Sequence, residues 1–417
     1  MSTSIAHLYT KCSPRTPMVC NALCQIPRFR LGCHIDIMNW QEIYAAYPIN
    51  ETATWLNNCG ITPTGRHIVT RMGAHFEQLA LHGPGADDAS LARLVSNVRQ
   101  RLGQLLHAQP DDIALIHNTA EGMTMVSLGL TLCAGDEILL LENEYPSNVY
   151  PWEHWRQHGV GLNFVQVGRT PDEFLINFER VLTPGTKVVA LSVVHWCTGM
   201  PLPIAEIARV CHAREILLIL DGSQGAGLVP IDFGALSPAV LCFSAWKWLL
   251  GPLGLGVIVM DHDTLSKLKM PFKATDSVAD PGQYLPYQTK MRATVDRYCY
   301  STANYNDWVY FDESLNFLAE IGFARVQQRI LELTSRLWVG LSQHGFLAAY
   351  DHGNAPQSGI LCVRKPGLDI HRLCADLGKR GFITRVRLEH LRLAPHVYQS
   401  PEQMDATVSA IDELARG

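Results

Sequence analysis

Short apolar stretches alternate with amphipathic helical stretches along most of the chain, and this alternation limits the possible folds more than any other feature. Stretches typical of strands include "DEILLLENE" (136–144), "KVVALSVVHW" (187–196) and "EILLILDGSQ" (215–224). A helical stretch, "LPIAEIARVCHARE", separates the last two. Strands that alternate with helices in this way are typical of α/β domains with a mostly parallel sheet. We therefore predict an α/β fold.

The pattern changes at both ends of this region. Residues 1–37 contain no acidic residue before Asp36, several Ser and Thr, and little helical periodicity. We predict a disordered N-terminal extension, which could lie upstream of a true start at Met38 or be an organellar transit peptide. Near residue 302 a long helical segment begins, followed by short strands and helices. A second, smaller domain is predicted there.

Composition and charge exclude several classes of partner. The 417 residues carry a formal net charge of -5, with no long Lys/Arg block, which argues against nucleic acid and anionic membranes. No apolar stretch reaches the length needed to span a membrane. Seven of the twelve cysteines are scattered singly through apolar segments, as in a reduced cytoplasmic protein, and no metal site is predicted.

Polar residues follow the predicted strands at the points where the strands end. In parallel sheets, ligands bind beyond the carboxyl ends of the strands, so these residues are the candidates for a site. Taken singly, each has an ordinary explanation, such as a helix cap, a turn residue or a rim aromatic. They are Asn118 and Thr119, Tyr145, His195 and Trp196, Asp221 and Gln224, and Ser244, Trp246 and Lys247.

Together these residues match the needs of pyridoxal phosphate. Its aldehyde requires an amine, which Lys247 would supply from an apolar, tryptophan-lined segment that lowers the lysine pKa. Its ring nitrogen requires a carboxylate, which Asp221 would supply. Its phosphate requires a helix N-terminus with hydroxyl donors, and an aromatic face completes the site.

At this point the sequence resembles the class V aminotransferases of fold type I, which include cysteine desulfurases, isopenicillin N epimerases and kynureninases. The resemblance runs from about Trp55 to the C-terminus and is carried by "TWLNNCG", "NTAEGM", "GDEILLLENEYPSNVYPW", "VVHWCTGMPLP", "LLILDGSQGAG", "CFSAWKWLLGPLGLG" and "LRLAPHVYQSPEQMD". It implies an N-terminal arm (38–62) packing on the small domain, a large cofactor-binding domain (63–302) with a mostly parallel seven-stranded type of sheet, and a small α+β domain (303–417).

The resemblance also implies a role for each matching residue. Lys247 matches the Schiff-base lysine, Asp221 the partner of the ring nitrogen, and Gln224 the residue at the phenolic oxygen. Tyr145 takes the stacking position. The phosphate would be held by Thr119, Ala120, Ser244 and Trp246, where desulfurases carry histidine in place of Trp246.

Other matches concern the substrate and a second subunit. Thr302 matches the residue that reaches a neighbour's phosphate, so a homodimer with shared active sites is implied. Arg392 matches the arginine that grips the substrate carboxylate, and Asn58 lies where the N-terminal segment approaches the substrate. His195 is a candidate acid or base.

The segment between Arg385 and Arg392 contains only "VRLEHL", without room for the loop that carries the catalytic cysteine of desulfurases. On this ground the sequence predicts that the chain is not a cysteine desulfurase. The predicted function is transaminase or lyase chemistry on a carboxylate-bearing amino acid, with amino-acid epimerisation or a non-catalytic binding role as alternatives. A nucleotide-binding dehydrogenase is disfavoured because no GxGxxG motif opens a helix after a first strand.

Overall fold

The computed structural model describes residues 38–83, 88–353 and 355–416, and these form one compact unit from Met38 onward. The predicted N-terminal extension, 1–37, lies outside the described residues. The N-terminal arm contains α1 (Trp40–Ala45), the short helix η1 (Pro48–Glu51) and β1 (Thr54–Trp55). Asn39 caps α1 by accepting hydrogen bonds from the amides of Gln41 and Glu42.

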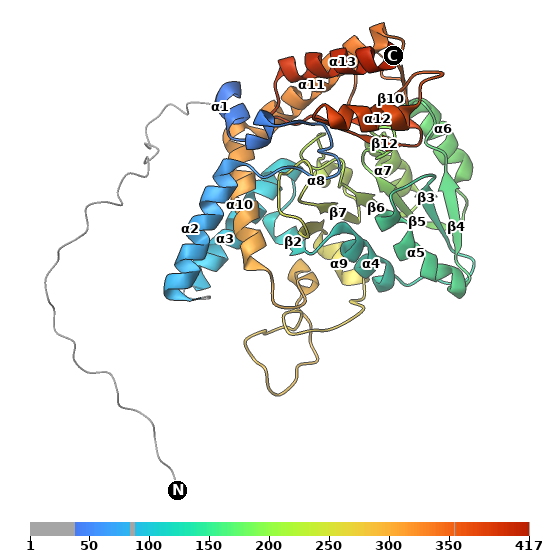
Figure 1. Cartoon of the computed structure of the whole chain (residues 1–417). Coiled ribbons are helices and arrows are strands. Elements are labelled where there is room, and N and C mark those ends of the chain that lie inside the picture. The colour runs from blue at the N-terminus through green and yellow to red at the C-terminus, as the bar shows by residue number, and fades with distance from the viewer. Residues whose placement is uncertain (1–37, 84–87, 354, 417) are drawn as a thin grey trace, which may run out of the picture. The chain divides into compact units, whose positions relative to one another are not determined.

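A seven-stranded sheet forms the centre of the large domain, with strand order β2-β8-β7-β6-β5-β3-β4 (Figure 1). All neighbouring strands are parallel except at β8, which runs antiparallel to both β2 and β7. This confirms the predicted α/β class with a mostly parallel sheet. The strands are β2 (Ile113–Ile116), β3 (Glu137–Leu141), β4 (Gly161–Val165), β5 (Thr186–Ser192), β6 (Leu217–Asp221), β7 (Val240–Ser244) and β8 (Gly256–Val259).

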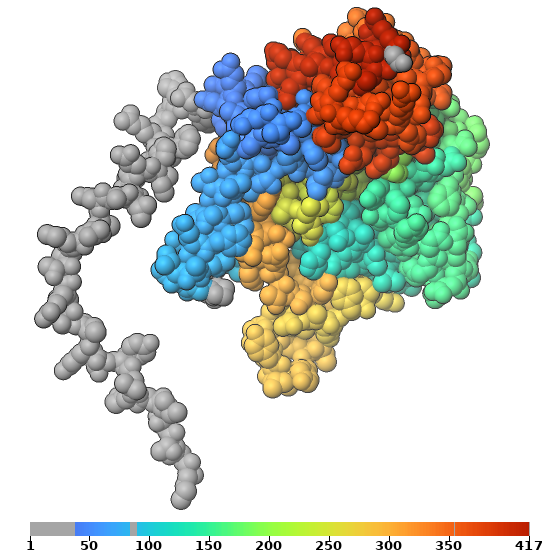
Figure 2. Space-filling view, in the orientation of Figure 1, coloured from blue at the N-terminus to red at the C-terminus, as the bar shows by residue number. Residues whose placement is uncertain are grey.

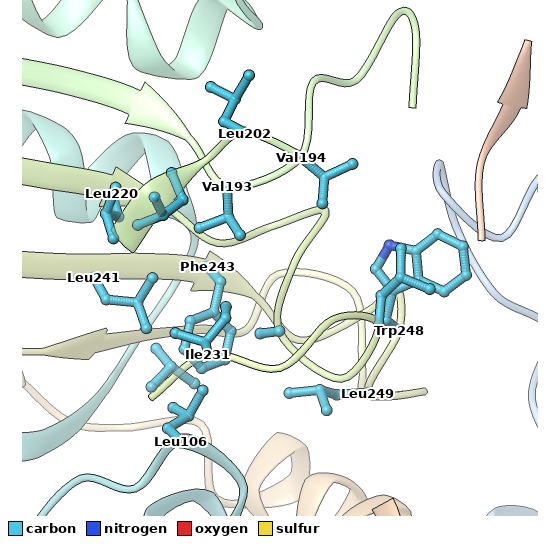
Figure 3. Packing of buried hydrophobic residues seen from close by; sticks show 14 of the residues in the cluster. Leu106, Val193, Val194, Leu202, Leu220, Ile231, Leu241, Phe243, Trp248 and Leu249 are labelled. Carbon is cyan, nitrogen blue, oxygen red and sulfur yellow. The ribbon is translucent and has the colours of Figure 1, made fainter. Parts of the chain in front are cut away.

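Helices cover both faces of this sheet, because successive side chains of a strand point to opposite sides. On β7, Leu241 and Phe243 join one buried cluster, while Val240 and Cys242 join the other. Figure 3 shows part of the first cluster, including Trp248. The helices on the first side include α3 (Asp88–Leu106), α6 (Pro171–Val181) and α7 (Ile204–Ala213); those on the second include α4 (Thr119–Gly129), α5 (Tyr150–Glu153) and α9 (His262–Lys267).

The C-terminal part of the chain forms a second, smaller sheet in the region where a small α+β domain was predicted. Its strand order is β12-β13-β10-β9, and its neighbouring strands are antiparallel. The strands are β9 (Leu347–Ala348), β10 (Leu361–Arg364), β12 (Arg385–Arg387) and β13 (His390–Leu393). The helices beside them in Figure 1 are α11 (Phe323–Gln343), α12 (Ile370–Lys379) and α13 (Pro401–Arg416).

Two connections join the parts of the chain. The arm pairs with the C-terminal part, because β1 forms a parallel pair with β11 (Phe382–Ile383). The helix α10 (Tyr305–Ile321) packs on α2 (Arg66–His82) and α3, on the side of the large domain. The domain limit at 302/303 remains a prediction. The first helix after that limit, α10, packs against helices of the large domain.

Between α9 and α10 the chain makes a long excursion that contains only the short helix η5 (Val295–Tyr298). Figure 2 shows this segment extending from the body of the large domain. Its Tyr284, Leu285 and Tyr287 are largely exposed. None of the described helices is long and apolar enough to cross a membrane.

Candidate active site

A cavity of about 310 Å³ opens beyond the carboxyl ends of the parallel strands, where the sequence predicted a site. It receives residues from the ends of β2, β3, β5, β6 and β7 and from the small domain. The structure therefore brings most of the predicted residues together. Those that line the cavity are Asn118, Thr119, Ala120, Tyr145, Trp196, Asp221, Gln224, Ser244, Trp246, Lys247 and Arg392.

Lys247 follows the end of β7 and is buried at 9% exposure. Its Nζ lies 5.5 Å from the centre of the Tyr145 ring. Burial lowers the pKa of Lys247, and the charge of Asp221 partly opposes this shift. This shift makes the uncharged amine, which is the form that can attack a carbonyl, easier to form than in a free lysine.

Asp221 is the last residue of β6 and is also buried. Its Oδ1 accepts a hydrogen bond from the amide of Ser223 at 2.8 Å. Burial raises the pKa of Asp221, while the charge of Lys247 and the hydrogen bonds from Ser223 lower it. A cationic group bound next to this carboxyl group would favour its ionised form.

The first turn of α4 forms one end of the cavity. Asn118 caps this helix by accepting a hydrogen bond from the amide of Glu121, and Thr119 and Ala120 line the cavity beside it. The helix approaches the sheet closely, since a Cβ on Gly122 would lie 2.6 Å from Ile116 Cδ1 and 2.8 Å from Cys242 Sγ. The first amides of a helix have no partner within the helix and favour an anion.

Hydroxyl groups surround the same end of the cavity. Ser223 Oγ is 2.9 Å from Thr119 Oγ1 and accepts a hydrogen bond from the amide of Ser244. The Oγ of Ser244 is buried and has no hydrogen-bond partner among the described residues. An unpaired buried hydroxyl next to a helix N-terminus is a donor that a bound phosphate would satisfy.

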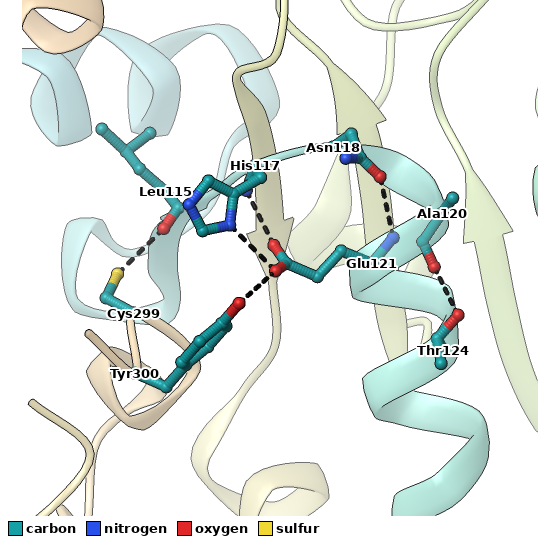
Figure 4. Close-up of polar contacts among 8 residues, drawn as sticks. All are labelled: Leu115, His117, Asn118, Ala120, Glu121, Thr124, Cys299 and Tyr300. Atoms are coloured by element: carbon teal, nitrogen blue, oxygen red, sulfur yellow. Dashed lines mark hydrogen bonds and ion pairs between the residues drawn. The ribbon is translucent and has the colours of Figure 1, made fainter. Parts of the chain in front are cut away.

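Glu121 fixes the position of this turn from the other side. Its carboxylate accepts hydrogen bonds from the amide of His117 at 2.8 Å and from the hydroxyl of Tyr300 at 2.9 Å (Figure 4). Tyr300 belongs to the segment that leads to Thr302. Hydrogen bonds to Glu121 therefore link the end of β2, the start of α4 and the segment that leads to Thr302.

The small sheet contributes Arg392, from β13, which lines the cavity and is 3% exposed. One of its NH groups donates to the carbonyl of Trp196 at 3.0 Å, and its Nε is buried without a partner among the described residues. The Trp196 ring meets the Tyr145 ring edge to face, with centres 5.2 Å apart. The site thus places a guanidinium group with an unpaired Nε beside an aromatic wall.

Three predicted residues do not line the cavity. His195 is buried, and its ring nitrogens contact Thr198 Oγ1 and the carbonyl of Asn143. Burial lowers the pKa of His195 to about 4. Asn58 is buried and donates hydrogen bonds to the carbonyls of Trp55 and Ala394, whereas Thr302 is exposed. Their predicted roles remain predictions.

Gln224 lines the cavity, but its amide already has protein partners. Its Nε2 donates to the carbonyl of Cys59 at 2.8 Å, and its Oε1 accepts from the indole of Trp248 at 2.9 Å. These bonds connect the end of β6 to the arm and to the residue after Lys247. In this arrangement Gln224 holds the walls of the cavity together.

Sequence reasoning missed several lining residues, among them Arg387, Ser223 and Cys59. Arg387 could have been found from its position relative to Arg392, which was predicted. The two lie on strands joined by a two-residue turn, at alternate positions shared with Arg385 and His390. Strand periodicity then places all four on one face of the hairpin. Ser223 lies two residues beyond Asp221, in the turn already identified.

Glu144 lies just before Tyr145 and was also missed. It is buried, and its carboxyl oxygens accept hydrogen bonds from the amides of Tyr145 and Ser192 and from the Ser192 hydroxyl. Burial, and then the charge of Asp221, raise the pKa of Glu144 to about 7. Because Glu144 fixes the amide of Tyr145, it is a positioning residue of the site.

The raised pKa of Glu144 predicts a dependence of stability on pH. The folded state binds this proton more tightly than the unfolded state, so the free energy of unfolding falls as the pH rises from about 4.5 to about 7. Glu144→Gln removes this contribution. Between pH 5 and pH 8, the stability of the variant relative to the wild type should rise by about 2 to 3 kcal/mol, as measured by urea unfolding of the cofactor-free protein. Parallel curves for the two proteins would contradict this explanation, and the exposed Glu142→Gln serves as the control.

A comparison of the sequence with known protein families shows the family of this chain. The family model described as Aminotransferase class-V matches residues 46–387, which is most of the chain. The chain belongs to the class V aminotransferases. This family depends on pyridoxal phosphate, so the predicted family and cofactor are confirmed.

Curated proteins from other organisms are similar over nearly the whole chain. A protein named probable cysteine desulfurase from Methanothermobacter thermautotrophicus is 24% identical over 91% of this chain and 98% of its own length. Isopenicillin N epimerase from Streptomyces clavuligerus is 25% identical over 91% of this chain and 99% of its own length.

Solved structures confirm fold type I. A structure of a Lys→Ala mutant of C-DES, with glycine covalently linked to its cofactor, superposes with a TM-score of 0.81 at 24% identity, covering 88% of this chain and 98% of C-DES. The structure of a cysteine desulfurase from Thermococcus onnurineus has a TM-score of 0.79 at 20% identity, covering 90% and 98% of the two chains.

These comparisons correct one prediction. The chain was predicted not to be a cysteine desulfurase because the segment between Arg385 and Arg392 is short. That exclusion is wrong, since relatives and solved structures that carry this name match nearly the whole chain. The structure does show a tight turn there, with Leu388 and Glu389 at positive φ. Loop length varies among related proteins, so a short turn at one position cannot exclude a class of enzyme.

Proposed function

We propose that this class V aminotransferase acts on a carboxylate-bearing amino acid by transaminase or lyase chemistry, with Lys247 as the amine that binds the cofactor covalently. The observation that carries this proposal is the joining of Lys247, Asp221 and Arg392 in one cavity of about 310 Å³. Such a reaction requires three groups of the protein: an amine, a buried carboxyl group and a guanidinium group with donors left for a carboxylate.

The residues of the cavity fit the cofactor. Thr119, Ala120 and Ser244 would hold its phosphate, because they combine the start of α4 with a buried hydroxyl that lacks a partner. Tyr145 would cover its ring, and Asp221 would hold a proton at its ring nitrogen. When bound, pyridoxal phosphate supplies an electron sink for negative charge that develops at the substrate's α-carbon.

The remaining groups would act on the substrate. Arg392 would bind the α-carboxylate, for which its planar guanidinium group with unused donors is suited. Lys247, once displaced by the substrate, would carry the proton to or from the α-carbon. The edge-to-face pair of Tyr145 and Trp196 would form the aromatic wall beside the substrate.

A homodimer is part of the proposal. Thr302 is exposed and lies outside the cavity, which is compatible with a residue that completes the site of a neighbouring subunit. Sedimentation equilibrium of the holoenzyme should therefore give twice the mass of the chain, and a monomer that binds the cofactor fully would contradict this part.

Absorption spectroscopy and product analysis test the function. Purified protein reconstituted with pyridoxal phosphate should show a visible band that shifts when a suitable amino acid is added. Product analysis then separates the reactions: a keto acid with retained nitrogen on the cofactor indicates transamination, and loss of a β-substituent indicates lyase chemistry. Conversion between enantiomers would instead favour the epimerase alternative, to which the Streptomyces clavuligerus relative lends support. A protein that binds the cofactor but shifts its band with no amino acid would overturn the proposal.

A further inference from the structure

The cavity contains a second arginine to which no role has yet been given. Arg387, on β12, lines it together with Arg392, on β13. In the register of this hairpin, Arg387 pairs with His390 and Arg392 pairs with Arg385. The two arginines are therefore diagonal neighbours on one face of the small sheet, within reach of one another for long side chains.

Both guanidinium groups approach the same aromatic ring. The central carbon of Arg387 is 5.6 Å from the centre of the Trp196 ring, and that of Arg392 is 5.9 Å from it. Trp196 is itself fixed, because its indole NH donates to the carbonyl of Asn143 at 2.8 Å. The ring therefore stabilises two positive charges on one wall of the cavity.

The hydrogen bonds of the two arginines leave most of their donors unused. Arg387 donates to the carbonyl of Val386 at 2.8 Å, and Arg392 donates to the carbonyl of Trp196. The Nε atoms of both are buried without a partner, and neither arginine forms an ion pair with a carboxylate in the part of the chain that the structure describes. Burial, followed by the charge of Arg392, lowers the pKa of Arg387.

Two unpaired positive charges exceed the need of a single α-carboxylate. If Arg392 binds that group, as the proposed function holds, Arg387 is left as a partly buried cation in an aromatic wall. Burying an unpaired charge is unfavourable, and a second anion would remove this cost while forming charge-assisted hydrogen bonds.

We propose that the substrate carries a second acidic group, so that the enzyme acts on an amino dicarboxylic acid, with Arg387 binding the side-chain carboxylate. This inference rests on the proposed function and defines its substrate class. Arg387 acts here as a specificity residue, distinct from the arginine that binds the α-carboxylate.

Calorimetric binding of unreactive acids to the holoenzyme tests this inference without turnover. Glutarate and adipate, which carry two carboxylates, should bind at least about tenfold more tightly than butyrate, which carries one. Arg387→Gln should remove about tenfold of the affinity for the better diacid and leave the affinity for butyrate within about twofold. Arg385→Gln is the matched control, because it removes the same charge from an exposed position on the same strand, outside the cavity.

The spectrum of the holoenzyme supplies a second readout. Glutamate and aspartate should shift the cofactor band at lower concentrations than glutamine and asparagine, and Arg387→Gln should abolish this preference while retaining the band. Equal affinities for diacids and monoacids, or an unchanged preference in Arg387→Gln, would overturn the inference. If no cofactor band forms in the wild type, the proposed function itself fails, so the two failures are distinguishable.

Discussion

Lys247→Ala is expected to reduce the rate of substrate turnover by at least about 10³-fold. The loss is large because one side chain has two tasks, covalent attachment of the cofactor and proton transfer at the substrate. Its buried position, 5.5 Å from the centre of the Tyr145 ring, leaves no other lysine among the described residues of the cavity to replace it. Steady-state rates with the best amino acid from the screen measure the effect.

Two further variants make this result specific. Lys247→Arg keeps a positive charge and much of the side-chain volume but should be as inactive as the alanine variant, because a guanidinium group stays protonated. Lys187→Ala, at an exposed position on β5, should retain wild-type rates. Turnover by Lys247→Arg at more than about a tenth of the wild-type rate would contradict the role of Lys247.

Asp221→Asn is expected to lower kcat by about 10²-fold or more while the cofactor remains bound. The substitution keeps the size of the side chain and an oxygen that can accept the hydrogen bond from Ser223, but it removes the charge opposite the ring nitrogen. Without this charge, negative charge at the substrate's α-carbon is less well stabilised.

The measurement is kcat under saturating substrate and cofactor, together with the absorption spectrum. Asp221→Glu, which restores the charge at a longer reach, should recover part of the rate. Rates for Asp221→Asn within about fivefold of the wild type would show that the carboxylate has no such role.

The large domain could be predicted well from the sequence, because apolar strands that end in polar residues determine both its fold and its site. In β6 and β7, apolar residues bury both faces of each strand, and the first polar residues appear where the strand ends. In a parallel sheet these ends share one edge, so Asp221, Ser244 and Lys247 could be expected to meet. The structure brings them together in one cavity.

Prediction was weaker where position depends on contacts between distant segments. Asn58 and His195 were selected by sequence position, but their side chains bond to the protein interior, through Ala394 and Asn143 among others. Arg387 enters the cavity only because the small domain places its hairpin beside Trp196. Strand periodicity puts Arg387 on the same face of the hairpin as Arg392, but it does not show which part of the large domain that face meets.

Borohydride reduction of the holoenzyme, followed by proteolysis and peptide mass spectrometry, tests the central claim most directly. Reduction makes the bond between the cofactor and its lysine permanent, so the modified peptide identifies the attachment point. The structure predicts a single modified residue, Lys247, and no modification in Lys247→Ala. Attachment at another lysine, or an unmodified wild-type protein after reconstitution, would contradict the assignment of the active site.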